Sequence, residues 1–142
     1  MFLLDTDHLV IIQRGTEPWY GRLFSRMSGF EPEDFYVSIV SFHEEVNGWN
    51  AYLSRARTGE GIVRAYGMFQ EILYYFSTLR TLPFDHAAEQ GFQSLRKQRV
   101  RVGTMDLRIA AIAISRGFTV LTRNLVDFHQ VPGLTAEDWT AS

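Results

Sequence analysis

Short apolar segments alternate with longer amphipathic segments along this chain, and this alternation constrains the fold more than any other feature. The segments 2–4, 35–39 and 118–122 are rich in strand-forming residues, and a further short extended piece contains Leu82. Helix-like segments lie between them. Strands that alternate with helices are typical of a parallel sheet, which needs helices on both of its faces. The sequence therefore predicts an α/β fold with a central parallel β-sheet.

The predicted helices are long enough to cover such a sheet. Apolar residues recur at helical spacing in the segments 19–27, 41–54, 62–79, 87–98 and 106–116. A shorter helix is predicted over 9–13 and a helical turn that ends at Phe128. The helix over 106–116 is expected to stop at Gly117, because glycine readily adopts the left-handed conformation that ends helices.

Composition limits the class of protein. A chain of 142 residues with 46% hydrophobic and 21% charged residues suits one globular domain spanning 1–142. The lack of cysteine excludes disulfides, thiolate metal ligands and a cysteine nucleophile. No apolar run approaches the roughly 18 residues of a membrane helix, and residues 1–4 lack the flanks of a signal peptide. We therefore expect a cytoplasmic enzyme or binding module.

Acidic or amide side chains follow the predicted strands or open the helices after them. They are Asp5, Asp7, Glu44, Glu45, Asp106, Asn124 and Asp127. In open parallel sheets, functional groups gather just beyond the carboxyl ends of the strands. We therefore expect the fold to bring these side chains together at one edge of the sheet.

A cluster of carboxylates has two chemical explanations. Like charges held close together repel and raise one another's pKa values, so the cluster needs either protonation or a divalent cation. Oxygen ligands in a chain without cysteine favour Mg²⁺ or Mn²⁺ over zinc, and these ions support phosphodiester cleavage. Taken singly, each residue also has a structural explanation, such as a helix cap at Asp5 or a capping box of Ser41 and Glu44. The metal site is inferred from their joint placement.

Four segments resemble, in order, the motifs of the PIN-domain family, and in particular its VapC-like toxins. Residues 3–7, Leu-Leu-Asp-Thr-Asp, resemble the opening motif. Residues 41–48 are similar to the second motif, in which glycine follows the glutamate by four positions. Residues 105–113 resemble the third, an aspartate that opens an alanine-rich helix, and residues 121–139 resemble the closing segment. Each motif alone is weak, whereas four in register over the whole chain are specific.

The resemblance implies a PIN-like α/β domain and an endoribonuclease that cuts structured RNA, such as tRNA or rRNA, with Mg²⁺ or Mn²⁺. It implies that Asp5, Glu44 and Asp106 bind the metal, and that Asn124 and Asp127 complete the catalytic site. It also implies a homodimer that is silenced by a cognate VapB-like antitoxin.

Three positions depart from the family pattern. Asn124 stands where many relatives carry Asp, which argues against a full second metal site. Asp7 stands where Asn is common and adds a negative charge. Glu45 stands where an apolar residue usually follows the catalytic glutamate, and the position of Gly48 favours Glu44 over Glu45 for that role.

Two other functions stay open on the sequence alone. One is a PIN-like module that binds RNA or a protein but cleaves weakly, suggested by the amide at Asn124. The other is a structure-specific DNA nuclease, against which the short chain counts. The four histidines lack zinc-like spacing, so we expect them to be surface or core residues. Candidate phosphate contacts are Arg96, Arg99, Arg101, Arg108 and Arg123.

Overall fold

The computed structural model describes residues 1–142 and contains one sheet of five parallel strands. The strands are β1 (Phe2–Leu4), β2 (Phe35–Ser38), β3 (Thr81–Leu82), β4 (Thr119–Leu121) and β5 (Ala136–Glu137). Their spatial order is β3-β2-β1-β4-β5, so β1 lies at the centre between β2 and β4. The predicted α/β fold with a central parallel sheet is confirmed.

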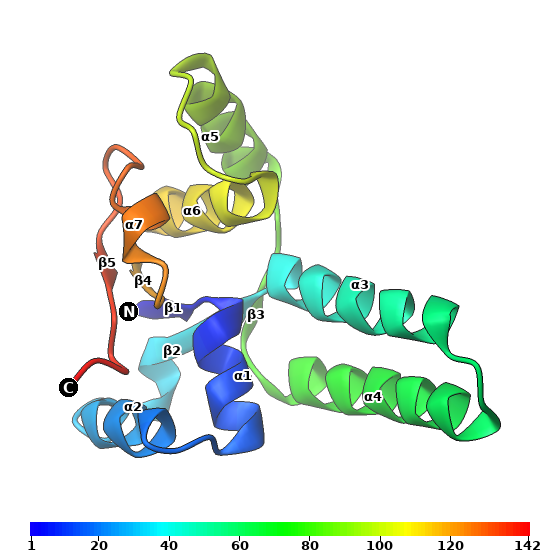
Figure 1. Cartoon of the computed structure of the whole chain (residues 1–142). Helices are drawn as coiled ribbons and strands as arrows, with labels where there is room; N and C mark the ends of the chain where they lie inside the picture. Colours follow the sequence, from blue (N-terminus) through cyan, green and yellow to red (C-terminus); the bar gives the residue numbers. More distant parts are fainter.

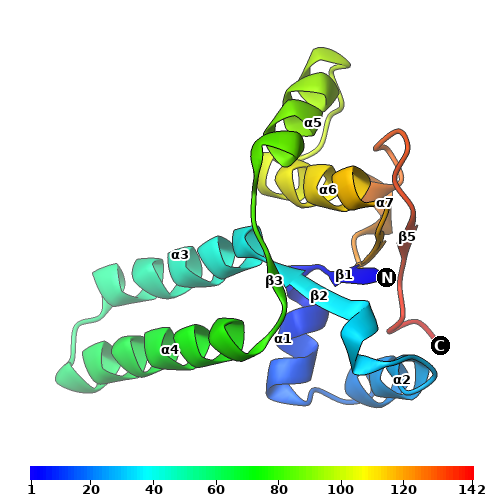
Figure 2. The ribbon, with the colours of Figure 1, turned by 180° about the vertical axis from the view of Figure 1, so that it is seen from behind.

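Helices cover both faces of this sheet. They are α1 (Thr6–Arg14), α2 (Trp19–Met27), α3 (Ile39–Arg55), α4 (Gly59–Thr78), α5 (His86–Lys97), α6 (Thr104–Arg116) and α7 (Leu125–Phe128), with a 3₁₀ turn at Pro32–Asp34. Figures 1 and 2 show α5, α6 and α7 on one side of the sheet and α1 and α2 on the other. The helices α3 and α4 form a hairpin that extends sideways from the strands.

The two faces of the sheet bury separate cores. Leu3 and Val120 pack in a core with α5 and α6, whereas their neighbours Leu4 and Leu121 pack in a second core with α1, α2 and α4. Successive side chains of a strand point to opposite faces, so a run of apolar residues serves both cores. The short apolar segments of the sequence are thus the buried centre of the fold.

Hydrogen bonds from polar side chains set the helix starts. Helix α1 begins at Thr6, earlier than predicted, because the Asp5 carboxylate accepts the Thr6 N–H at 2.8 Å. Helix α3 begins at Ile39 because Ser38 accepts the Ser41 N–H. Glu44 therefore lies in the second turn of α3, and the capping box of Ser41 and Glu44 is wrong. Helix α6 ends, as predicted, at a left-handed Gly117.

The hairpin of α3 and α4 leaves apolar side chains uncovered. On α4, Ile72 and Phe76 are buried against the sheet, whereas Tyr66, Leu73 and Tyr74 are each more than half exposed. The apolar residues of the helix predicted over 62–79 therefore divide between the core and the surface. None of the helices, α4 included, has the length and apolar character that crossing a membrane requires.

Candidate active site

Three carboxylates that are far apart in the sequence meet at the carboxyl edge of the sheet. Asp5 follows β1, Glu44 lies on α3 directly after β2, and Asp106 lies in the first turn of α6. One carboxylate oxygen of each residue lies within 4.8 Å of the other two. We call these three residues the acid cluster. It contains the three residues to which the family resemblance assigns metal binding.

Asp5 is the most buried member of the acid cluster, with 5% of its surface exposed. Its Oδ2 accepts a hydrogen bond from the Thr122 hydroxyl at 2.9 Å, while its Oδ1 caps α1. Burial, followed by the neighbouring charge of Asp7, raises the pKa of Asp5 from 3.8 to about 7. A nearby positive charge would therefore favour its ionised form at neutral pH.

Asp106 lies in a similar electrostatic environment. Burial and the charge of Glu44 raise its pKa, whereas the Asn124 amide, which donates to Asp106 Oδ2 at 3.3 Å, lowers it. The same amide donates to Asp127 Oδ2 at 2.9 Å. Asn124 therefore lies between two carboxylates as a donor to both, and Asp127 stands outside the acid cluster.

Glu44 is held by a residue of the opening motif. The Thr6 hydroxyl lies 2.8 Å from Glu44 Oε1 and 2.9 Å from the Ser41 hydroxyl. Because an ionised carboxylate only accepts, Thr6 donates to Glu44. This contact links the first turn of α1 to α3 and orients Glu44 toward Asp5.

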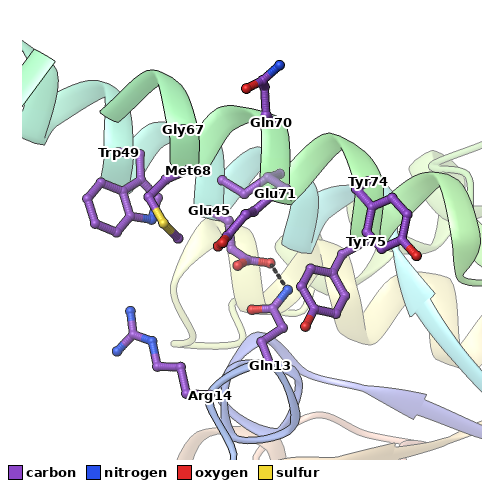
Figure 3. A pocket seen from close by; sticks show the side chains of 11 residues that line it. Gln13, Arg14, Glu45, Trp49, Gly67, Met68, Gln70, Glu71, Tyr74 and Tyr75 are labelled. Carbon is purple, nitrogen blue, oxygen red and sulfur yellow. Dashed lines mark hydrogen bonds between the residues drawn. The ribbon is translucent and has the colours of Figure 1, made fainter. Parts of the chain in front are cut away.

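Glu45, the next residue, lies in a different environment. It lines a cavity of about 520 Å³ between α1, α3 and α4, together with Arg14, Trp49 and Glu71 (Figure 3). Its only side-chain hydrogen bond comes from Gln13 Nε2 at 3.4 Å, and burial raises its pKa. The structure thus places Glu44 rather than Glu45 in the acid cluster, in line with the spacing to Gly48.

Asp7 connects the acid cluster to a buried histidine that the sequence did not single out. Asp7 Oδ1 lies 2.8 Å from His8 Nδ1, and Trp139 N–H donates to His8 Nε2 at 3.2 Å. A backbone amide can only donate, so in this contact Nε2 accepts and Nδ1 is the ring nitrogen that faces Asp7. His8 is fully buried, as expected of a core histidine. The sequence placed Trp139 in the closing motif, but only the structure shows that its backbone N–H binds His8.

Thr122 is another residue whose role only the structure reveals. Its hydroxyl bonds Asp5 at 2.9 Å and lies 3.3 Å from Asp7 Oδ2, and it accepts the Asn124 N–H at 3.0 Å. It is fully buried at the end of β4. Its position at the end of the strand predicted over 118–122 was the one sign of it in the sequence.

The arginines considered as phosphate contacts are dispersed. Arg99 and Arg101 line a surface hollow beside the turn after α7. Arg96 and Arg108 both lie over the ring of Phe92. Arg123 directly follows Thr122, and its side chain lies over a different aromatic ring. Among the five arginines, it alone has a backbone N–H that donates to a residue beside the acid cluster, Asp7.

Comparisons with known proteins agree on one family. No protein-family model matches this chain. Over 141 residues it is 27% identical to ribonuclease VapC1 of Rickettsia felis, which covers 93% of this chain and 91% of that protein. A stretch of 69 residues is 38% identical to a tRNA(fMet)-specific endonuclease VapC of Salmonella typhimurium and covers 46% of this chain and 52% of that protein. DNA-bound VapBC of Salmonella typhimurium superposes with a TM-score of 0.73 and 26% identity over 97% of each chain.

The parallel sheet, with carboxylates gathered beyond its carboxyl edge, is an α/β fold that matches the fold of VapC structures. The similarity to VapC proteins extends over nearly the whole chain in sequence and in fold. In sequence and in fold the chain thus resembles VapC proteins of the PIN-domain type.

Proposed function

We propose that this chain is a metal-dependent endoribonuclease, the toxin component of a VapBC-like toxin–antitoxin pair, and that it cleaves structured RNA such as tRNA or rRNA. The convergence of Asp5, Glu44 and Asp106 on a VapC-like fold is the observation that carries this proposal. The relatives are named a ribonuclease and a tRNA-specific endonuclease, which supports the same substrate class.

The residues of the acid cluster fit Mg²⁺ or Mn²⁺. They offer hard carboxylate oxygens, and three such ligands suffice because Mg²⁺ keeps several waters. The raised pKa values of Asp5 and Asp106 also fit, since a divalent cation would offset the repulsion that raises them. Asp5, Glu44 and Asp106 would hold the ion, which supplies an activated water and offsets negative charge on the phosphodiester.

Residues around the acid cluster hold its carboxylates in place. Thr6 donates to Glu44 and Thr122 donates to Asp5, so both carboxylates keep defined orientations. In this proposal Asn124 orients Asp106 and Asp127, and Asp127 acts from outside the acid cluster as an auxiliary acid. The chain thereby supplies both the charge of the site and its rigidity.

The proposal includes a VapB-like antitoxin and a second copy of the chain as protein partners. The Salmonella neighbour was solved as a VapBC complex bound to DNA. On this chain, exposed apolar side chains follow α4, among them Val63, Tyr66 and Leu73. Uncovered apolar surface of this kind is typical of protein interfaces, and it supports a partner that covers the helix hairpin.

Cleavage of a mixed tRNA and rRNA preparation tests the proposal. Purified protein is incubated with Mg²⁺, Mn²⁺ or EDTA, alongside the variants Asp5→Asn and Asp106→Asn. We expect cleavage with either ion, none in EDTA, and none by either variant. Cleavage that survives both substitutions would contradict the assigned site, and RNA binding without cleavage under every condition would identify a binding module instead.

A further inference from the structure

Trp19 and Arg123 form a pair beside the acid cluster. The guanidinium of Arg123 lies over the Trp19 ring, 4.4 Å from its centroid. Trp19 is the first residue of α2 and is partly exposed, whereas Arg123 follows β4 and is exposed. The ion pairs of the chain do not include Arg123. Its positive charge is therefore held by an aromatic ring and not neutralised by a carboxylate.

The backbone places this pair next to the acid cluster. Arg123 N–H donates to Asp7 Oδ2 at 2.9 Å. The residue before it, Thr122, bonds Asp5, and the residue after it, Asn124, bonds Asp106. Arg123 therefore lies between two residues that contact the acid cluster. An unneutralised cation at this point suits an anion that approaches the cluster.

We propose that Trp19 and Arg123 form a subsite for a nucleotide of single-stranded RNA next to the bond that is cut. This inference rests on the proposed ribonuclease function and adds a substrate contact to it. Arg123 binds a phosphate of the strand through its guanidinium. When the guanidinium turns toward that phosphate, it uncovers the Trp19 ring, on which the neighbouring base stacks.

The other arginine–tryptophan pairs of the chain lack this combination. Arg26 lies over Trp139, which is only 2% exposed within an aromatic cluster. Arg64 lies over Trp49, 5.5 Å from the ring centroid, on the hairpin of α3 and α4. Trp49 is partly exposed, as Trp19 is, but it lines the cavity around Glu45. The Arg64–Trp49 pair is therefore a matched control for a pair of the same chemistry at another place.

Binding of a hexanucleotide RNA, measured without turnover, tests the subsite. A fluorescein-labelled, mixed-sequence single strand is titrated in EDTA and followed by anisotropy at several salt concentrations. We expect Arg123→Gln to weaken binding about tenfold and to lower the slope of log affinity against log salt by about 0.7, the share of one phosphate contact on a single strand. Trp19→Leu is expected to weaken binding about tenfold with the slope unchanged, because stacking carries no charge.

Two further variants separate the subsite from general damage to the fold. Trp19→Phe keeps an aromatic face and should recover most of the RNA affinity lost in Trp19→Leu. If Trp19 had only a structural role, the RNA affinities of the two variants would not depend on whether the side chain can stack on a base. Arg64→Gln should bind as the unaltered chain does. In the Trp49→Phe variant the remaining tryptophans are Trp19 and Trp139. Saturating RNA should change the tryptophan emission of this variant, and the change belongs to Trp19 because Trp139 is buried away from the RNA.

The outcomes distinguish this subsite from the proposed cleavage. Unchanged affinity and salt slope in both Arg123→Gln and Trp19→Leu would overturn the subsite, even if the protein cuts tRNA. The expected losses in a protein that cuts no RNA with Mg²⁺ or Mn²⁺ would support the subsite and contradict the ribonuclease. A loss of affinity in Arg64→Gln equal to that in Arg123→Gln would also overturn the subsite, since the effect would then belong to net charge.

Discussion

The acid cluster and the cavity around Glu45 meet at consecutive residues of α3, Glu44 and Glu45, but the contacts of these two carboxylates differ. The acid cluster around Glu44 holds three carboxylates within 4.8 Å of one another. Each of them accepts a side-chain hydrogen bond, from Thr6, Thr122 or Asn124. In the cavity around Glu45, that carboxylate accepts a single side-chain hydrogen bond, from Gln13 at 3.4 Å. One region is constrained and the other is loosely held, although they meet at consecutive residues.

The difference shows that the surroundings of a carboxylate, and not its residue type, decide its role. Consecutive residues of a helix point about 100° apart, so Glu44 faces the carboxyl edge of the sheet while Glu45 faces α4. Burial raises the pKa of Glu45 as it does for Asp106. Perturbed pKa values alone therefore do not separate the two regions, whereas the convergence of several carboxylates does.

The largest effect is expected on RNA cleavage. Glu44→Gln removes one of the three carboxylates of the acid cluster and should reduce the cleavage rate by about 1000-fold or more, because ligand charge and hydrogen-bond geometry are lost together. Glu45→Gln, the matched change one residue away, should retain cleavage close to that of the unaltered chain. Rates of tRNA cleavage with Mg²⁺ measure both. Equal losses of cleavage rate in the two variants would show that Glu44 and Glu45 do not differ in their roles.

The second effect is on stability against pH in the absence of metal. The pKa of Asp5 is about 7 in the folded chain and 3.8 ordinarily, so between these values the folded state binds more protons than the unfolded state. The free energy of unfolding should therefore fall as pH rises from about 4 to about 7, by on the order of 4 kcal/mol, and then level off. Urea unfolding at a series of pH values, with EDTA, measures this fall.

Variants of the two regions sharpen this test. Asp5→Asn should remove most of the fall, while Glu45→Gln should remove less, because Glu45 is less buried than Asp5. Mg²⁺ added above pH 7 should restore stability to the unaltered chain by binding its ionised carboxylates. A profile that is flat in EDTA would contradict the electrostatic description of the acid cluster.

The smallest expected effect is on the free energy of unfolding when the hydrogen-bond partner of Asp7 or of Glu45 is removed. His8→Ala leaves Asp7 and the Trp139 N–H without their buried partner and should lower the free energy of unfolding by about 2 kcal/mol. Gln13→Ala removes the single partner of Glu45 and should change it by no more than about 0.5 kcal/mol. Chemical unfolding of both variants at one pH gives the difference. A larger cost at Gln13 would show that the cavity is the more constrained region.

Much of the fold was readable from the sequence because its signals are local. The helix over 19–27 is observed with those bounds, and the strand over residues 2–4 likewise. Apolar runs and helical spacing depend on neighbours within a few residues, and so does the stop at Gly117. Strand β5 was not anticipated. It has two residues, and its pairing with β4 defines it.

The candidate site divides in the same way. The sequence indicated Asp5, Glu44 and Asp106 because motif spacing and parallel-sheet topology are properties of chain order. The contacts that hold these residues were not readable, since they join positions far apart in the sequence. The separation is 18 residues for Asn124 with Asp106, 38 for Thr6 with Glu44 and 117 for Thr122 with Asp5. No short-range pattern encodes such pairs.

By itself the sequence thus determined an α/β chain whose acidic residues follow its strands. The spacing to Gly48 already favoured Glu44 over Glu45. The tertiary structure alone decided that Glu45 lines a cavity, that His8 connects Asp7 to Trp139, and that Arg123 lies over Trp19. The physical reason is that hydrogen bonds and cation–aromatic contacts form between whichever groups the packing brings within a few ångströms, and packing depends on the whole chain.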